Sequence, residues 1–137
     1  MADLTIAGTV KKVSGSTVTD RGVAGVTISA GKSLYKDLTN SDKLALADAD
    51  TEAASIFEGI ALHDAVADQP IEYATGGLLD MGTTVVVIGQ SYVVSTTAGG
   101  IAPYGDLASG DYPSHIGFGK TATRIEIVRN RSRVPKA

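Results

Sequence analysis

The chain has 137 residues, a formal net charge of −3 and no cysteine. This length is enough for one domain with its own hydrophobic core, and the absence of cysteine excludes disulfides, thiolate catalysis and cysteine-ligated zinc. No run of about 18 apolar residues is present, so we expect no membrane span and no membrane partner. The first residues also lack the basic and apolar regions of a signal peptide.

Acidic and basic residues are unevenly distributed along the chain. Between Asp37 and Asp111 there are twelve acidic residues and one basic residue, Lys43, whereas the two ends carry the other eleven basic residues. This distribution indicates either two docking surfaces of opposite sign or a solvated surface with uneven charge.

The pattern of apolar residues predicts a mainly β protein. Glycine is frequent, tryptophan is absent, and valine, isoleucine and threonine are spread through the chain. A continuous apolar run, Thr84–Ile88, predicts a strand that is covered on both faces. Apolar residues in short or alternating runs predict the other strands, in chain order, over residues 4–10, 26–29, 43–46, 59–62, 71–74, 78–81, 92–94, 116–119 and 124–128.

The sequence predicts one short helix, Glu52 to Phe57, of about two turns. Asp50 or Thr51 can cap its start, and Gly59 follows its end. Turn residues recur about every eight to twelve residues, as in a small β-barrel or β-sandwich-like domain. We expect a single domain over residues 1–128, with 1–24 as an N-terminal strand or arm, and a basic, mobile tail over 129–137.

Gly31-Lys32-Ser33 resembles the end of a phosphate-binding loop. That motif needs a glycine five residues before Gly31, where this chain has Val26, and a helix after the serine. The β-branched residues before the turn and the polar residues after it favour a strand, a turn at Ala30-Gly31, and a second strand. We therefore expect no nucleotide or other cofactor.

The remaining candidate sites have simpler structural explanations. His63 and His115 fall on different predicted strands, so the sequence indicates neither a catalytic pair nor a metal site. The run Asp48–Glu52 resembles part of a calcium loop but lacks its central glycine and its final glutamate. The C-terminal arginines have no aromatic residues among them to stack bases, so we expect no nucleic-acid partner.

Five stretches together resemble the capsid decoration, or cement, proteins of tailed phages. The resemblance covers residues 25–128 and is strongest over residues 92–112, around AGGIAP. The stretches are AGKSLYKD, KLALADADTEAASIFEGIALHDA, QPIEYATGGLLDMG, GQSYVVSTTAGGIAPYGDLASGDY and IGFGKTATRIEIV.

The resemblance implies a β-rich, non-enzymatic virion protein. Such proteins are often homotrimers that bind the outer face of the capsid, stabilise the shell and have the major capsid protein as their partner; they are made in the host cytoplasm. The predicted strands over 71–74, 78–81 and 84–88 are candidates for the trimer interface, the alternative being that they fill the monomer core. The candidate capsid or subunit contacts lie near the two ends: Lys11, Lys12, Arg124, Arg129, Arg131 and Arg133.

Two other functions remain open from the sequence. A tail- or fibre-associated β module could bind a host receptor or glycan through the long loop 95–112, with Tyr92, Tyr104 and Tyr112 as a stacking surface. A nucleotide-dependent recombination factor would need Lys32 in a true phosphate loop. We expect no catalytic residues and no metal ligands.

Overall fold

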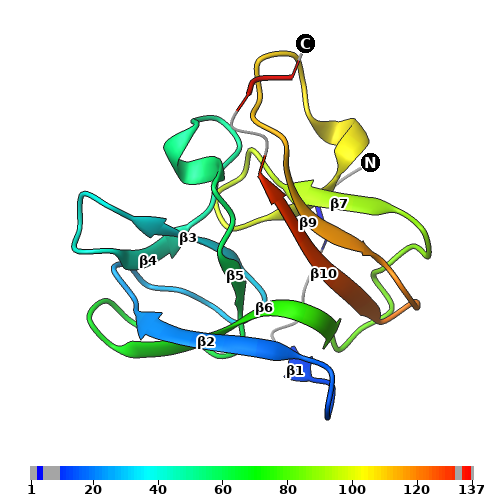
Figure 1. Ribbon diagram of the computed structural model, residues 1–137, viewed down its shortest axis with the longest axis horizontal. Helices are drawn as coiled ribbons and strands as arrows, with labels where there is room; N and C mark the ends of the chain where they lie inside the picture. The colour runs from blue at the N-terminus through cyan, green and yellow to red at the C-terminus, as the bar shows by residue number, and fades with distance from the viewer. Residues whose placement is uncertain (1–2, 5–9, 132–133, 137) are drawn as a thin grey trace.

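The computed structural model describes residues 3–4, 10–131 and 134–136. Every ladder between its named strands is antiparallel, and the strands join into one curled sheet that forms a half-barrel (Figure 1). The strands of this part of the chain are β1 (Lys11–Lys12), β2 (Val18–Val23), β3 (Ser33–Asp37), β4 (Lys43–Leu46), β5 (Gly59–Ala61), β6 (Pro70–Asp80), β7 (Ser91–Val94), β8 (Ile101–Pro103), β9 (Ser114–Gly119) and β10 (Arg124–Arg131).

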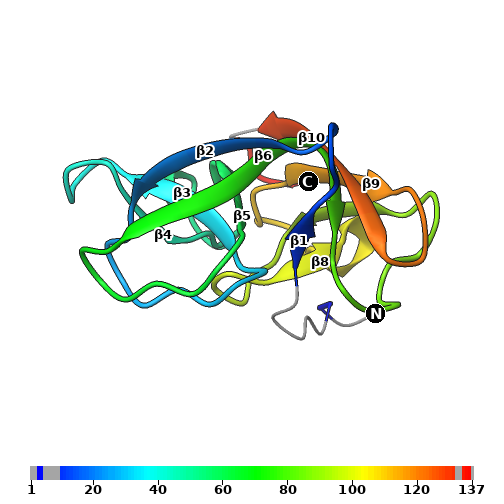
Figure 2. The ribbon, with the colours of Figure 1, turned by 90° about the horizontal axis from the view of Figure 1, so that it is seen from below.

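The mainly β class predicted from the sequence is confirmed. The order of the main sheet is β4-β3-β5-β6-β10-β9-β7-β8, and β1 and β2 both pair with β6. Seen from below, β2 runs along β6 for much of its length (Figure 2). Within the described part of the chain, no helix has the length and apolar character needed to cross a membrane.

Strand β6 is longer than the sequence predicts. The sequence predicts two strands, over residues 71–74 and 78–81, but one strand runs through Gly76 and Gly77 between them. The pairing of β6 with β2 shifts register between Val18 and Thr19, and Gly77 has a φ of +75°. A side chain at Gly77 would also collide with the carbonyl oxygen of Ser16. Gly77 therefore bends the strand and admits a neighbouring backbone, as at a β-bulge, without ending the strand.

The buried apolar residues form two cores that share β6. The smaller core, on one side, includes Ile71 and Tyr73 of β6 and Leu44 of β4. The sheet curls around it, because Ala24 bridges Leu44 and brings the chain after β2 back to β4. The larger core includes Ala74 and Leu79 of β6. Strands β7, β8, β9 and β10 contribute seven of its buried residues: Tyr92, Val93, Val94, Ile101, Ile116, Ile125 and Ile127.

Two predicted strands are absent. Residues 26–29 form no strand; Ile28 makes a single bridge to Ala65. The apolar run Thr84–Ile88 is also not a strand, because its backbone follows the β9–β10 turn: the Val86 N–H donates to the Ala122 carbonyl at 3.0 Å. Val86 is buried, whereas Val87 and Ile88 are 53% and 70% exposed.

The predicted helix is reduced to a single turn. It is a 3-10 helix, η1 (Ala53–Ser55), and Ile56 already has non-helical backbone angles. The next residue, Phe57, is fully buried in the larger core, so its packing stops the helix after one turn. A second 3-10 helix, η2 (Tyr104–Asp106), was not predicted.

The segment 95–112, predicted to be a long exposed loop, is partly buried. It contains β8, whose three residues are all buried and which pairs with β7. The prediction overlooked this strand because its three residues end in a proline and lie between glycine-rich turns. The predicted strand over residues 4–10 falls largely outside the described residues; at its start, the Leu4 N–H donates to the Ile101 carbonyl at 2.8 Å.

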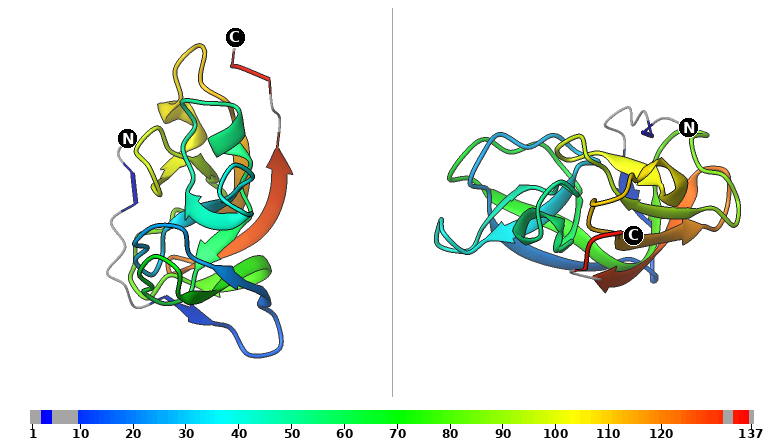
Figure 3. Two further views of the ribbon diagram at one scale, coloured as in Figure 1. Left: turned by 90° about the vertical axis from the view of Figure 1, so that its left-hand side faces the viewer. Right: turned by 90° about the horizontal axis from the view of Figure 1, so that it is seen from above.

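The described C-terminal residues contact the chain near η2. Strand β10 extends to Arg131, and the Lys136 N–H donates to the Asp111 carbonyl at 2.6 Å. The Lys136 ammonium lies 4.6 Å from the centre of the Tyr104 ring. Figure 3 shows this C-terminal segment beside the chain that leads from η2 to β9.

Candidate interaction surfaces

Three of the predicted basic contact residues meet at one end of β6. Lys11 of β1 and Arg124 of β10 are both register partners of Asp80, one on each side of it. Lys12 is next to Lys11, is exposed, and its ammonium lies 3.6 Å from the Glu72 carboxylate. Successive residues of a strand point to opposite faces of the sheet, so Lys11 and Arg124 flank Asp80 on one face and Lys12 lies on the other. The antiparallel pairing thus gathers basic residues that are far apart in the sequence at this end of the sheet, and we call this group the basic surface.

The other predicted basic residues do not join this surface. Arg129 lies farther along β10, where its guanidinium donates to the Glu58 carbonyl at 3.1 Å and is 3.5 Å from the Glu58 carboxylate. The backbone of Arg131 pairs with Ser114 at the end of β10, and Arg133 lies outside the described residues. The structure therefore separates Arg129 from the Lys11, Lys12 and Arg124 group.

A second surface is a groove between the β3–β4 turn and η1, which we call the acidic groove. It has a volume of about 530 Å³. Its apolar lining includes Leu38, which is 77% exposed, and Ile56, while Asp37, Glu52 and Glu58 supply carboxylates. The other lining residues are Tyr35, Lys36, Thr39 and Ala53.

Neighbouring carboxylates give this side of the molecule a negative field. Burial raises the pKa of the Tyr35 hydroxyl, and the charges of Asp37 and Asp48 raise it further. The pKa of the Asp50 carboxyl is also raised, first by Asp48 and then by desolvation and Asp111. Burial is the larger cause at Tyr35, whereas the like charge of a neighbouring carboxylate is the larger cause at Asp50.

A third surface, which we call the apolar tip, consists of the exposed residues Val87 and Ile88. Its backbone is held against the β9–β10 hairpin, because the Gly89 N–H donates to the Gly119 carbonyl at 2.8 Å. Lys120, the next residue after Gly119, is exposed. This tip is not predicted from the sequence, because its apolar run is typical of a buried strand. The flanking glycines Gly82 and Gly89, which have φ of +82° and +80°, are the signal that favours a loop.

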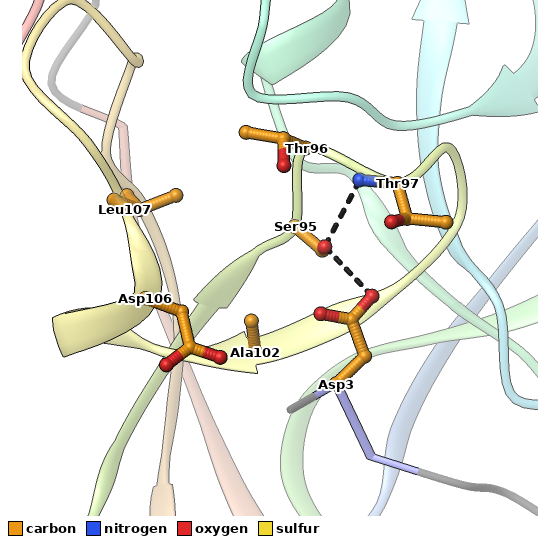
Figure 4. Close-up of a pocket in the computed structure, with 7 residues that line it drawn as sticks. All are labelled: Asp3, Ser95, Thr96, Thr97, Ala102, Asp106 and Leu107. Atoms are coloured by element: carbon orange, nitrogen blue, oxygen red, sulfur yellow. Dashed lines mark hydrogen bonds between the residues drawn. The ribbon is translucent and has the colours of Figure 1, made fainter. Parts of the chain in front are cut away.

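A hydroxyl-lined pocket of about 550 Å³ lies between the β7–β8 turn and the N-terminal residues (Figure 4). The Ser95 hydroxyl is its most buried polar group; it donates to the Asp3 carboxylate at 2.7 Å and accepts from the Thr97 N–H at 3.0 Å. Both interactions are structural: one closes the turn and the other anchors Asp3. Asp106, Thr96, Ala102 and Leu107 complete the lining.

The two histidines are apart and each has structural partners. The His63 ring accepts from the Glu72 N–H at 3.1 Å and lies 2.9 Å from the Asp64 carbonyl. The His115 ring is 3.0 Å from the Ser91 hydroxyl. Within the described ranges, no three His, Asp or Glu residues are grouped as a metal site would require.

Gly31-Lys32-Ser33 forms a turn followed by a strand. Gly31 has a φ of +86°, and its N–H donates to the Ala61 carbonyl. Ser33 begins β3, is fully buried, and its N–H donates to the Gly99 carbonyl. A phosphate loop needs free backbone N–H groups and a following helix, so this geometry does not suit a nucleotide.

The three tyrosines proposed as a glycan-stacking surface do not form one. Tyr92 is buried, and its hydroxyl accepts from the Val87 N–H at 2.9 Å. The Tyr104 ring stacks on His115 with 5.6 Å between ring centres, and Tyr112 is only partly exposed. The hypothesis of a glycan site on segment 95–112 therefore loses its aromatic platform.

Fold and surfaces together define a mainly β half-barrel that presents a basic surface, an acidic groove and an apolar tip. No family model matches the sequence, and no curated protein matches it.

Proposed function

We propose that the protein is a non-enzymatic component of a tailed-phage virion. It binds the outer face of the assembled capsid, as a trimer, and stabilises the shell through contacts with the major capsid protein. The resemblance of residues 25–128 to decoration proteins motivates the proposal. The observation that fits it best is the mainly β half-barrel, whose named strands are held together by antiparallel ladders.

A domain of this kind suits repeated binding to a lattice. Its backbone is held in antiparallel ladders, so it loses little conformational entropy on docking. Many copies on one shell multiply weak contacts, and binding only to the assembled form stabilises that form by mass action. In this role the basic surface of Lys11, Lys12 and Arg124 contacts acidic groups of the capsid.

Co-sedimentation with capsids tests the proposal. Purified protein is mixed with expanded capsids of the phage that encodes it, assembled without it, and the pellet is analysed. We expect saturable binding. We also expect combined reversal of Lys11, Lys12 and Arg124 to glutamate to weaken it about tenfold or more, because the steering charges and the contacts change sign.

A matched control reverses one charge elsewhere. Lys43 lies on β4, is separated from β6 by β3 and β5 in the sheet, and is not part of the proposed contact surface. Lys43→Glu should bind capsids as the unmodified protein does. Absence of the unmodified protein from the capsid pellet would reject the proposed function.

A further inference from the structure

The acidic groove and the apolar tip lie at opposite ends of the molecule. In Figure 1, where the longest axis is horizontal, the β3–β4 turn and η1 are on the left and the β9–β10 turn is on the right. The groove lies between the β3–β4 turn and η1, and the backbone of the tip is hydrogen-bonded to the β9–β10 hairpin. The tip therefore cannot reach the groove of its own chain.

The two surfaces match in chemistry. The groove combines the apolar Leu38 and Ile56 with carboxylates from Asp37, Glu52 and Glu58. The tip presents the apolar Val87 and Ile88 with the cationic Lys120 close by. Lys36 and Arg129 offset part of the groove's charge, but Asp48 adds negative charge near Tyr35, one of the lining residues.

From this complementarity we infer that the acidic groove of one copy receives the apolar tip of a second copy. The contact buries Val87 and Ile88 against Leu38 and Ile56 and places Lys120 near the carboxylates of the groove. Burial of exposed apolar surface supplies most of the affinity, and the opposite charges fix the orientation.

Such a contact is head to tail, because different surfaces of the two copies meet. Repetition of a head-to-tail contact gives a closed ring or an open filament. Closure after three copies would give the trimer of the proposed function, so the ring size rests on that proposal. The groove–tip contact itself does not, because it follows from the two surfaces alone.

Single substitutions on each surface test the contact. Ile88→Asp places a carboxylate on the tip, and Leu38→Asp places one in the groove. Both side chains are exposed, so the monomer fold should survive, which circular dichroism checks. In sedimentation equilibrium we expect the unmodified protein to self-associate and each variant to associate at least tenfold more weakly.

The matched control is Val66→Asp, which makes the same chemical change at a 51% exposed position on the chain between β5 and β6. It should associate like the unmodified protein. Equal loss of association in this variant would overturn the assignment of the two surfaces.

Mixing the two variants gives the sharpest result. Ile88→Asp keeps its groove and Leu38→Asp keeps its tip, so one intact contact remains possible between them. We expect a 1:1 heterodimer and no larger species. A mixture that stays monomeric, or an unmodified protein that is monomeric at every concentration, would overturn the inference.

The same samples separate this inference from the proposed function. If self-association fails but capsids still bind the protein, only the groove–tip contact is rejected. If self-association follows the expected pattern but capsids bind no protein, only the capsid role is rejected.

Discussion

The two cores on either side of β6 are built differently. The smaller core is enclosed by the curl of β2, β3, β4, β5 and β6 and centres on Tyr73. The larger core fills the space under β7, β8, β9 and β10 and contains Tyr92. Both tyrosine rings are almost fully buried, but their hydroxyls differ: that of Tyr92 accepts from the Val87 N–H, whereas that of Tyr73 has no hydrogen-bond partner within the described part of the chain.

This difference connects the larger core to the surface that we propose for self-association. The Tyr92 hydroxyl holds the backbone of the apolar tip, so packing inside the larger core positions an exposed surface. The smaller core has no such polar link at Tyr73, and its role is to close the curl of the sheet. Substitutions that affect one core and spare the other therefore test whether the two regions have these separate roles.

The largest effect is expected at Gly117, on β9 beside the larger core. A Cβ atom there would lie 1.8 Å from the Glu126 carbonyl oxygen, a backbone atom that cannot move without disturbing β10. We expect Gly117→Ala to lower the free energy of unfolding by about 3 kcal/mol, measured by denaturant titration.

Gly76 provides the control on the β2 side of the bend in β6. A Cβ atom there would be 3.7 Å from the nearest atom, in Val18, and the residue has no positive φ. Gly76→Ala should change stability by less than about 0.5 kcal/mol. Equal losses of stability in the two variants would show that the close approach of Gly117 to the Glu126 carbonyl oxygen does not cause the loss.

The next effect is a loss of stability at alkaline pH that comes from the smaller core. Burial raises the pKa of Tyr73 to about 12, from an ordinary value of 10.0, and the charges of Asp20 and Glu58 add to the shift. Below pH 10 the hydroxyl is protonated in both the folded and the unfolded chain. Between pH 10 and 12 the unfolded chain loses this proton more readily, so stability falls as the pH rises.

The fall attributable to Tyr73 should reach about 2 to 3 kcal/mol by pH 12. Urea titrations at pH 9 and pH 12 measure it, and Tyr73→Phe removes the titrating group. A Tyr73→Phe variant that loses as much stability over this range as the unmodified protein would contradict the assignment.

The smallest expected effect is the difference in stability at neutral pH between removing the Tyr92 hydroxyl and removing the Tyr73 hydroxyl. Tyr92→Phe removes the acceptor of the Val87 N–H, so we expect a loss of about 1 kcal/mol. Tyr73→Phe removes a buried hydroxyl without a partner and should be neutral or stabilising. Thermal unfolding of both variants measures the difference, and a larger loss in Tyr73→Phe would reverse the comparison.

Local patterns of apolar residues predicted several of the strands correctly. The range predicted for β4 agrees with the structure, and β7, β9 and β10 were found within a few residues of their observed ends. The strand predicted over Thr84–Ile88 was wrong because a short apolar run has no periodicity that distinguishes a strand from a loop held against a hairpin. The break predicted between residues 74 and 78 was wrong because glycine permits a bend within a strand as readily as a turn.

The surfaces were harder to predict, because they depend on pairings distant in sequence. Lys11 and Arg124 become neighbours only through their common partner Asp80. The acidic groove lies between the turn after β3 and η1, and no local sequence pattern predicts that these two segments are close. The uneven distribution of charge was visible in the sequence, but its arrangement around Leu38 was not.

We propose that this half-barrel works by repeated binding to a shell, and electron cryomicroscopy of expanded capsids mixed with the purified protein tests this proposal most directly. We expect added density on the outer face, in three-fold clusters that fit three copies of the domain, with the surface of Lys11 and Arg124 toward the shell. Capsids that look the same with and without saturating protein would contradict it.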